Sequence, residues 1–139
     1  MRFPTILGRF VVGAVTATAC TLSLASPASA QPPGGCVPDV YFELDAHGFV
    51  TAYPAARCGT NGPYRSIIIS ATLEVDGRAF VDSSESRYSN RGGGVVPGKG
   101  VRARNEEGNN RFCAITTVSW RYRHALQAES RTGRICATY

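Results

Sequence analysis

One stretch of the sequence, from Ile67 to Asp82, constrains the fold more than any other. Its apolar residues recur at every second position from Ile67 to Val75, and the positions between them hold Ile68 followed by serine, threonine and glutamate. This period of two is that of a half-buried β-strand. Asp76-Gly77 lies within the stretch and is a preferred pair for a two-residue hairpin turn. The stretch therefore predicts a hairpin in which Leu73 lies opposite Phe80 on the buried face.

The chain after residue 36 keeps the same short period between turn residues. No helical period occurs in this part of the sequence. Short strands with regular turn signals are typical of β-sandwiches and barrels. We expect an all-β domain, a small antiparallel β-sandwich or open barrel of six to eight strands. Further strands are expected at 40–45, 49–53, 101–105, 112–128 and 135–138, with a stop at Pro54, a glycine-rich loop at 90–100 and a turn at 131–133.

Four cysteines follow the first thirty residues: Cys36, Cys58, Cys113 and Cys136. An even number of cysteines in a short exported chain indicates two disulfides. Three connectivities are open, and we favour Cys36–Cys58 with Cys113–Cys136 because each closes a local loop. A zinc site is the alternative, but the C-x-x-C spacing typical of zinc sites does not occur.

The first thirty residues are typical of an export signal. Arg2 and Arg9 precede an apolar run over 10–24, and Ala28-x-Ala30 is a small-residue cleavage site. We predict a signal peptide at 1–30, a flexible leader at 31–36, a single β-domain at 37–139 and a secreted protein. No other segment approaches the roughly 18 apolar residues of a membrane span.

The basic residues are unevenly distributed along the chain. Residues 31–86 carry three basic and seven acidic residues, whereas 87–139 carry ten and three. Such asymmetry can mark a site for an anionic partner. The alternative is that strands of the two halves interleave and mix the charges. Fourteen of the fifteen basic residues are arginine, which favours a high-GC genome and an actinobacterial origin.

Little in the sequence points to catalysis. The chain has two histidines, His47 and His124, and neither lies in a recognisable nucleophile or metal motif. Gly93-x-x-x-x-Gly98-Lys99 matches most of a phosphate loop, but glycine replaces the Ser or Thr at position 100 and a β pattern follows. We therefore predict that the protein is not an enzyme and uses no cofactor or metal.

The single tryptophan, Trp120, allows two interpretations. In a strand, Val118, Trp120 and Tyr122 share one face, which could belong to the core. Alternatively, Trp120, Arg121 and Tyr122 are displayed, because these residue types are enriched at binding hot spots. The two interpretations require opposite exposures of the same indole.

The segment Cys113-x-x-x-x-x-Ser119-Trp120-Arg121-Tyr122 resembles the tendamistat-type proteinaceous α-amylase inhibitors of streptomycetes. That resemblance implies a small secreted β-sandwich with two disulfides, in which Trp120 and Tyr122 pack in an amylase cleft and Arg121 faces its carboxylates. It covers ten residues, and the triplet lies near the C-terminus here rather than near the N-terminus. The Arg-Cys-Gly, Leu-Glu-Val-Asp-Gly and Ser-Arg-Thr-Gly-x-x-Cys segments also resemble small exported actinobacterial proteins of unassigned function.

We expect a monomeric, non-catalytic binding protein outside the cell, and the sequence allows two functions for it. The first is inhibition of an extracellular hydrolase, with Trp120, Arg121 and Tyr122 as anchors. The second is binding to an anionic polymer such as teichoic acid or extracellular DNA. The residues expected to bind the polymer are Arg87, Arg91, Lys99, Arg102, Arg104 and Arg111.

Overall fold

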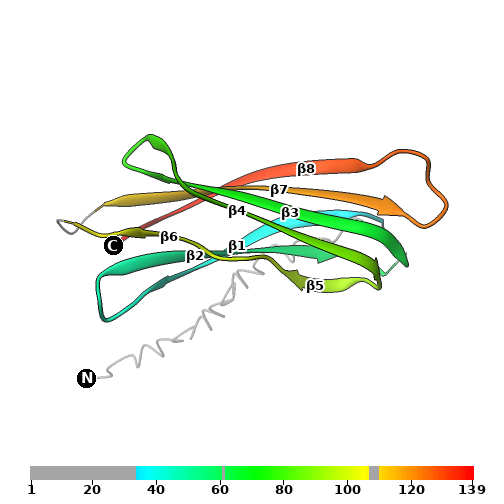
Figure 1. Cartoon of the computed structure of the whole chain (residues 1–139), viewed down its shortest axis with the longest axis horizontal. Helices are drawn as coiled ribbons and strands as arrows, with labels where there is room; N and C mark the ends of the chain where they lie inside the picture. Colours follow the sequence, from blue (N-terminus) through cyan, green and yellow to red (C-terminus); the bar gives the residue numbers. More distant parts are fainter. Residues whose placement is uncertain (1–33, 61, 107–109) are drawn as a thin grey trace, which may run out of the picture.

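The structure is a computed structural model that describes residues 34–60, 62–106 and 110–139. The described residues form eight strands in two antiparallel sheets, which confirms the predicted all-β fold (Figure 1). The first sheet contains β1, β2, β5 and β6, and the second has the order β4-β3-β7-β8. The strands are β1 (Cys36–Leu44), β2 (Phe49–Cys58), β3 (Tyr64–Val75), β4 (Arg78–Arg91), β5 (Gly94–Pro97), β6 (Val101–Arg104), β7 (Arg111–Tyr122) and β8 (Glu129–Thr138).

The predicted hairpin joins β3 and β4. Asp76 and Gly77 both have positive φ, as a two-residue turn of this kind requires. The register beyond the turn was predicted wrongly, because a bulge near Val75 places Leu73 opposite Asp82 instead of Phe80. In this register Asp82 accepts the backbone N–H of Arg102 from β6 at 2.9 Å, a tertiary contact that the local pattern does not contain.

Pro54 was expected to end a strand, but it lies inside β2. β2 pairs with β6 through Ala52 and with β5 from Ala55 onward, so Pro54 lies where its neighbour changes. Its missing N–H therefore breaks no ladder. Its carbonyl accepts the N–H of Gly98 at 2.7 Å.

The C-terminal hairpin also differs from its prediction. β7 ends at Tyr122, and the expected turn at 131–133 lies inside β8. Gly133 serves packing between the sheets, since a Cβ there would lie 3.0 Å from Cγ of Pro38. The glycine-rich segment 90–100 likewise contains the short strand β5.

Both predicted disulfides are present, and each joins neighbouring strands of one sheet. Cys36–Cys58 links β1 to β2, and Cys113–Cys136 links β7 to β8. Cys36, which the sequence placed in the flexible leader, is the first residue of β1. The predicted signal peptide at 1–30 lies outside the described residues.

The core between the sheets has two centres. One contains Trp120, Tyr64 and the Cys36–Cys58 disulfide, and the other contains Phe112 and Leu73. The two halves of the chain interleave, since each sheet takes strands from both. The acidic and basic halves therefore do not form separate bodies.

No helix long and apolar enough to cross a membrane occurs in the part of the chain that the structure describes.

Candidate binding surface

Trp120 belongs to the core. Its side chain is 2% exposed, and a Cβ on Gly35 would lie 2.9 Å from its Cζ2 atom. Tyr122 is half-buried and stacks on Tyr64, with ring centroids 5.2 Å apart. The interpretation of Trp120 as a core residue is confirmed, and its interpretation as a displayed anchor is wrong. The alternation of residue types in β7 could not distinguish the two interpretations, because either face of the strand could have packed in the core.

The predicted basic residues do not gather at one site. Arg87 lies on the outer face of the second sheet and pairs with Glu85 at 2.7 Å. Arg91 lies over the Tyr88 ring at the end of β4. Lys99 lies between β5 and β6, and Arg111 begins β7. Only Arg102 and Arg104 come together.

The period of two in β2 and β6 positions these two arginines. Val50 and Ala52 of β2 point into the core, as do their partners Ala103 and Val101 of β6. The residues between them must point to solvent. Arg102 and Arg104 therefore emerge on the outer face of the first sheet, opposite Thr51 and Phe49.

Phe49 lies beneath both guanidinium groups. The Arg102 Cζ atom lies 4.1 Å from the centroid of the Phe49 ring, and that of Arg104 lies 5.7 Å away. A cation over an aromatic face is attracted to it and is held in place. Within the described chain, neither guanidinium group has a carboxylate oxygen within 4.0 Å, although the backbone N–H of Arg102 donates to Asp82. Both side chains are therefore exposed and outside any direct ion pair with a described residue.

Two tyrosines lie beside this arginine pair. Tyr41 of β1 is directly opposite Tyr53 of β2, on the same outer face. They are 66% and 42% exposed, and their ring centroids are 6.3 Å apart with planes inclined by 26°. We call Tyr41, Phe49, Tyr53, Arg102 and Arg104 together the aromatic–arginine face.

The sequence predicted the two arginines of this face as binding residues but not its aromatic residues. The available signal was the alternation itself, which places Tyr41 and Tyr53 opposite the core positions of their strands. The sequence did not reveal that β2 pairs with both β1 and β6, which brings the tyrosines and the arginines onto one face.

Acidic residues near the face are few and mostly engaged. Asp39 forms an ion pair with Arg57, whose Nε donates at 2.8 Å. Asp45 accepts the backbone N–H groups of Phe49 and His47, and the Phe49 bond is the main cause that lowers the pKa of its carboxyl. The positive charge of Arg102 lowers this pKa further, so Asp45 is a neighbour of the arginine pair. Glu43, opposite Thr51, is the remaining carboxylate of β1.

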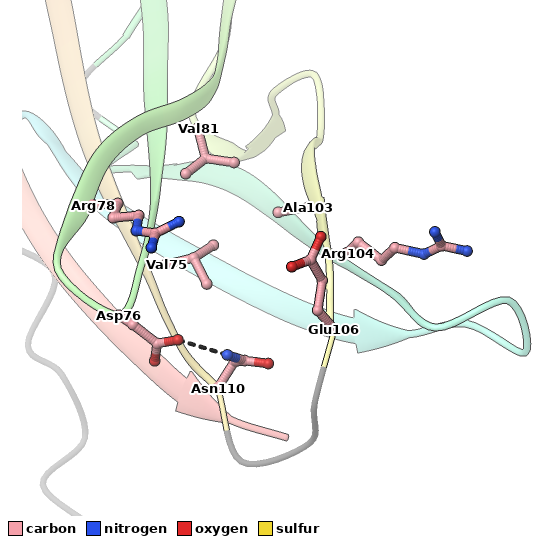
Figure 2. A pocket seen from close by; sticks show the side chains of 8 residues that line it. All are labelled: Val75, Asp76, Arg78, Val81, Ala103, Arg104, Glu106 and Asn110. Carbon is pink, nitrogen blue, oxygen red and sulfur yellow. Dashed lines mark hydrogen bonds between the residues drawn. The ribbon is translucent and has the colours of Figure 1, made fainter.

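A groove of about 470 Å³ lies at the end of the sandwich near the β3–β4 turn (Figure 2). Asp76 at its rim accepts the N–H of Arg111 at 2.8 Å and the Asn110 amide at 2.6 Å. These bonds, that from Arg111 first, lower the pKa of Asp76 and tie its carboxylate to the fold. Figure 2 shows the Arg104 side chain pointing away from Asp76 and Asn110. Arg104 thus lines the groove and also belongs to the aromatic–arginine face, so the two surfaces meet at this residue.

Both histidines are exposed, His47 between β1 and β2 and His124 between β7 and β8. Among the described residues, no three His, Cys, Asp or Glu side chains are grouped so that they could hold a metal ion. The absence of catalysis stays a prediction.

The sequence matches no known protein family and no curated protein. Among solved structures, the chain is similar to the crystal structure of a protein from Archaeoglobus fulgidus, with 8% identity and a TM-score of 0.43. That similarity covers 76% of this chain and 98% of the other. Function is therefore inferred from the chemistry of the aromatic–arginine face.

Proposed function

We propose that this chain is a secreted, non-catalytic binding protein that binds an extracellular anionic polymer through the aromatic–arginine face. The observation that carries the proposal is the placement of Arg102 and Arg104. Both lie over Phe49 on a solvent-facing sheet, without a carboxylate partner in the described chain. Guanidinium groups bind carboxylates and phosphates through paired hydrogen bonds.

Inhibition of a hydrolase is the weaker of the two functions considered. It relied on a displayed Trp120, and that side chain is 2% exposed and packed against Gly35. Presenting it to an enzyme cleft would require opening the core around the Cys36–Cys58 disulfide. Polymer binding requires no such rearrangement.

The proposal is tested by the salt dependence of binding. The oxidised protein is titrated with immobilised hyaluronan and with poly(dT), at about 50 and about 200 mM salt. Binding that releases counterions weakens over this range. In a plot of the logarithm of the affinity against the logarithm of the salt concentration, each charge contact contributes a slope of about one. We expect Arg102→Gln with Arg104→Gln to weaken binding and to reduce the slope by up to about 2.

The matched control is Arg87→Gln with Arg134→Gln. It removes the same charge from the outer face of the second sheet, where these arginines pair with Glu85 and Glu74. We expect it to leave the affinity for both polymers nearly unchanged. If the two double variants bind equally well, or if no anionic polymer binds at low salt, the proposed function is wrong.

A further inference from the structure

We infer that the polymer is an acidic polysaccharide whose sugar rings stack on Tyr41 and Tyr53 while its acidic groups meet Arg102 and Arg104. This inference rests on the proposed function and specifies its ligand. It is based on the exposed tyrosine pair, which lies on the same sheet face as the arginine pair. Binding through charge alone would not require these tyrosines.

The tyrosine pair has no role in the core. Tyr41 and Tyr53 lie on the solvent side of the first sheet, and both are exposed. Tyrosine and arginine are among the residue types enriched at binding hot spots, and here two of each share one sheet face. A pyranose ring offers an apolar face of C–H groups with hydroxyls at its rim. A tyrosine matches it, with an apolar ring face and a polar tip.

Gly100 makes room for the tyrosine platform. A Cβ at this position would lie 3.2 Å from Cδ1 and Cε1 of Tyr53 and 3.1 Å from Cγ2 of Thr51. The absence of a side chain lets Tyr53 lie against the backbone between β5 and β6, with Tyr41 on its other side. Rings held in place before binding lose little conformational entropy when a ligand arrives.

The charge density of the face favours a polysaccharide over a nucleic acid. Nucleic acids also stack on aromatic side chains, so stacking alone does not separate the two classes. Nucleic acids carry a charge on every phosphate and are bound by continuous positive grooves. Here two exposed arginines lie near Glu43, and Asp39 neutralises Arg57. A carboxylate repels any acidic group near it but accepts hydrogen bonds from sugar hydroxyls, so Glu43 opposes a polymer with widely spaced charges less than one with a charge on every unit.

A chain with one acidic group on every second sugar fits this arrangement. Arg102 and Arg104 are two residues apart on one strand, so their Cα atoms are separated by about 6.6 Å. They therefore form one local cluster of charge instead of a track. Hyaluronan has this charge pattern, and its carboxyl methyl ester is the matched neutral polymer.

The experiment measures binding of the oxidised protein to immobilised hyaluronan, its methyl ester and poly(dT). We expect hyaluronan to bind more tightly than the other two. Tyr41→Ala with Tyr53→Ala should weaken hyaluronan binding at least about tenfold. Tyr41→Phe with Tyr53→Phe keeps the rings and should retain most of the affinity. Leu126→Ala, which truncates an apolar side chain that is 95% exposed on another surface, should change nothing.

The outcomes separate this inference from the proposed function. If poly(dT) binds more tightly than hyaluronan, or if Tyr41→Ala with Tyr53→Ala binds hyaluronan like the unmodified protein, the polysaccharide inference is wrong. The proposed function then still stands, provided that Arg102→Gln with Arg104→Gln weakens binding. If neither acidic polymer binds, both fail together.

Discussion

At the scale of single residues, the burial of Trp120 depends on a glycine that packs against its side chain. Gly35 precedes β1 with φ of +111°, and its Cα lies against the indole. The glycine therefore meets two demands, a backbone conformation that L-residues rarely adopt and contact with a buried ring. A sequence pattern reveals neither, which is why the sequence left both a buried and a displayed Trp120 open.

Gly35→Ala should destabilise the protein by about 2–4 kcal/mol, because it adds strain in the backbone to overpacking against Trp120. The matched control is Gly48→Ala, which has a positive φ of 78° but no neighbouring atom within 4 Å of the added Cβ. It should cost about 1–2 kcal/mol. Urea unfolding followed by Trp120 emission measures both. Equal losses would mean that the indole yields freely, contrary to its tight packing.

At the scale of elements, β4 is held by polar side chains that face inward. Its exposure alternates, with Asp82, Ser84, Ser86 and Tyr88 on the less exposed side. Ser84 donates to the carbonyl of Lys99 at 2.6 Å, and Ser86 accepts the Lys99 N–H at 2.8 Å. Tyr88 donates to the carbonyl of Pro97. These bonds attach β4 to the segment that joins β5 and β6.

Replacing Ser84 and Ser86 together by alanine should weaken this attachment by about 1–3 kcal/mol, since each bond contributes on the order of 1 kcal/mol. Amide hydrogen exchange of Lys99 should become faster, because its N–H loses the Ser86 hydroxyl as acceptor. Ser83→Ala with Ser89→Ala, on the exposed side of the same strand, is the control. Unchanged protection of the Lys99 amide in the Ser84 and Ser86 variant would contradict the attachment.

At the scale of the whole molecule, the sequence predicted the class of fold but not the arrangement of its strands. Apolar alternation and four cysteines were sufficient for an all-β domain with both disulfides correctly paired. The length of β4 was not predicted, because polar residues occupy its inward side. Gly133 was assigned to a turn because glycine is common in turns, whereas here it lies in β8 and makes room for Pro38. The aromatic–arginine face joins residues that lie up to 63 positions apart, from Tyr41 to Arg104. Strand order, which local patterns do not contain, brings them together.

The two disulfides allow two contributions to stability to be compared, the loss of entropy of the unfolded chain on loop closure and the packing of the disulfide in the core. They span 22 and 23 residues, so closing either loop should stabilise the fold by a similar amount, about 3 kcal/mol. Cys36–Cys58 also belongs to the core cluster with Trp120, whereas Cys136 is only half-buried. Replacing Cys36 and Cys58 by alanine should therefore cost about 1–2 kcal/mol more than replacing Cys113 and Cys136, because it leaves a cavity in the core. Urea unfolding of both variants measures the difference. Equal losses would show that loop closure accounts for the whole effect, and the core around Trp120 would then have to repack without cost.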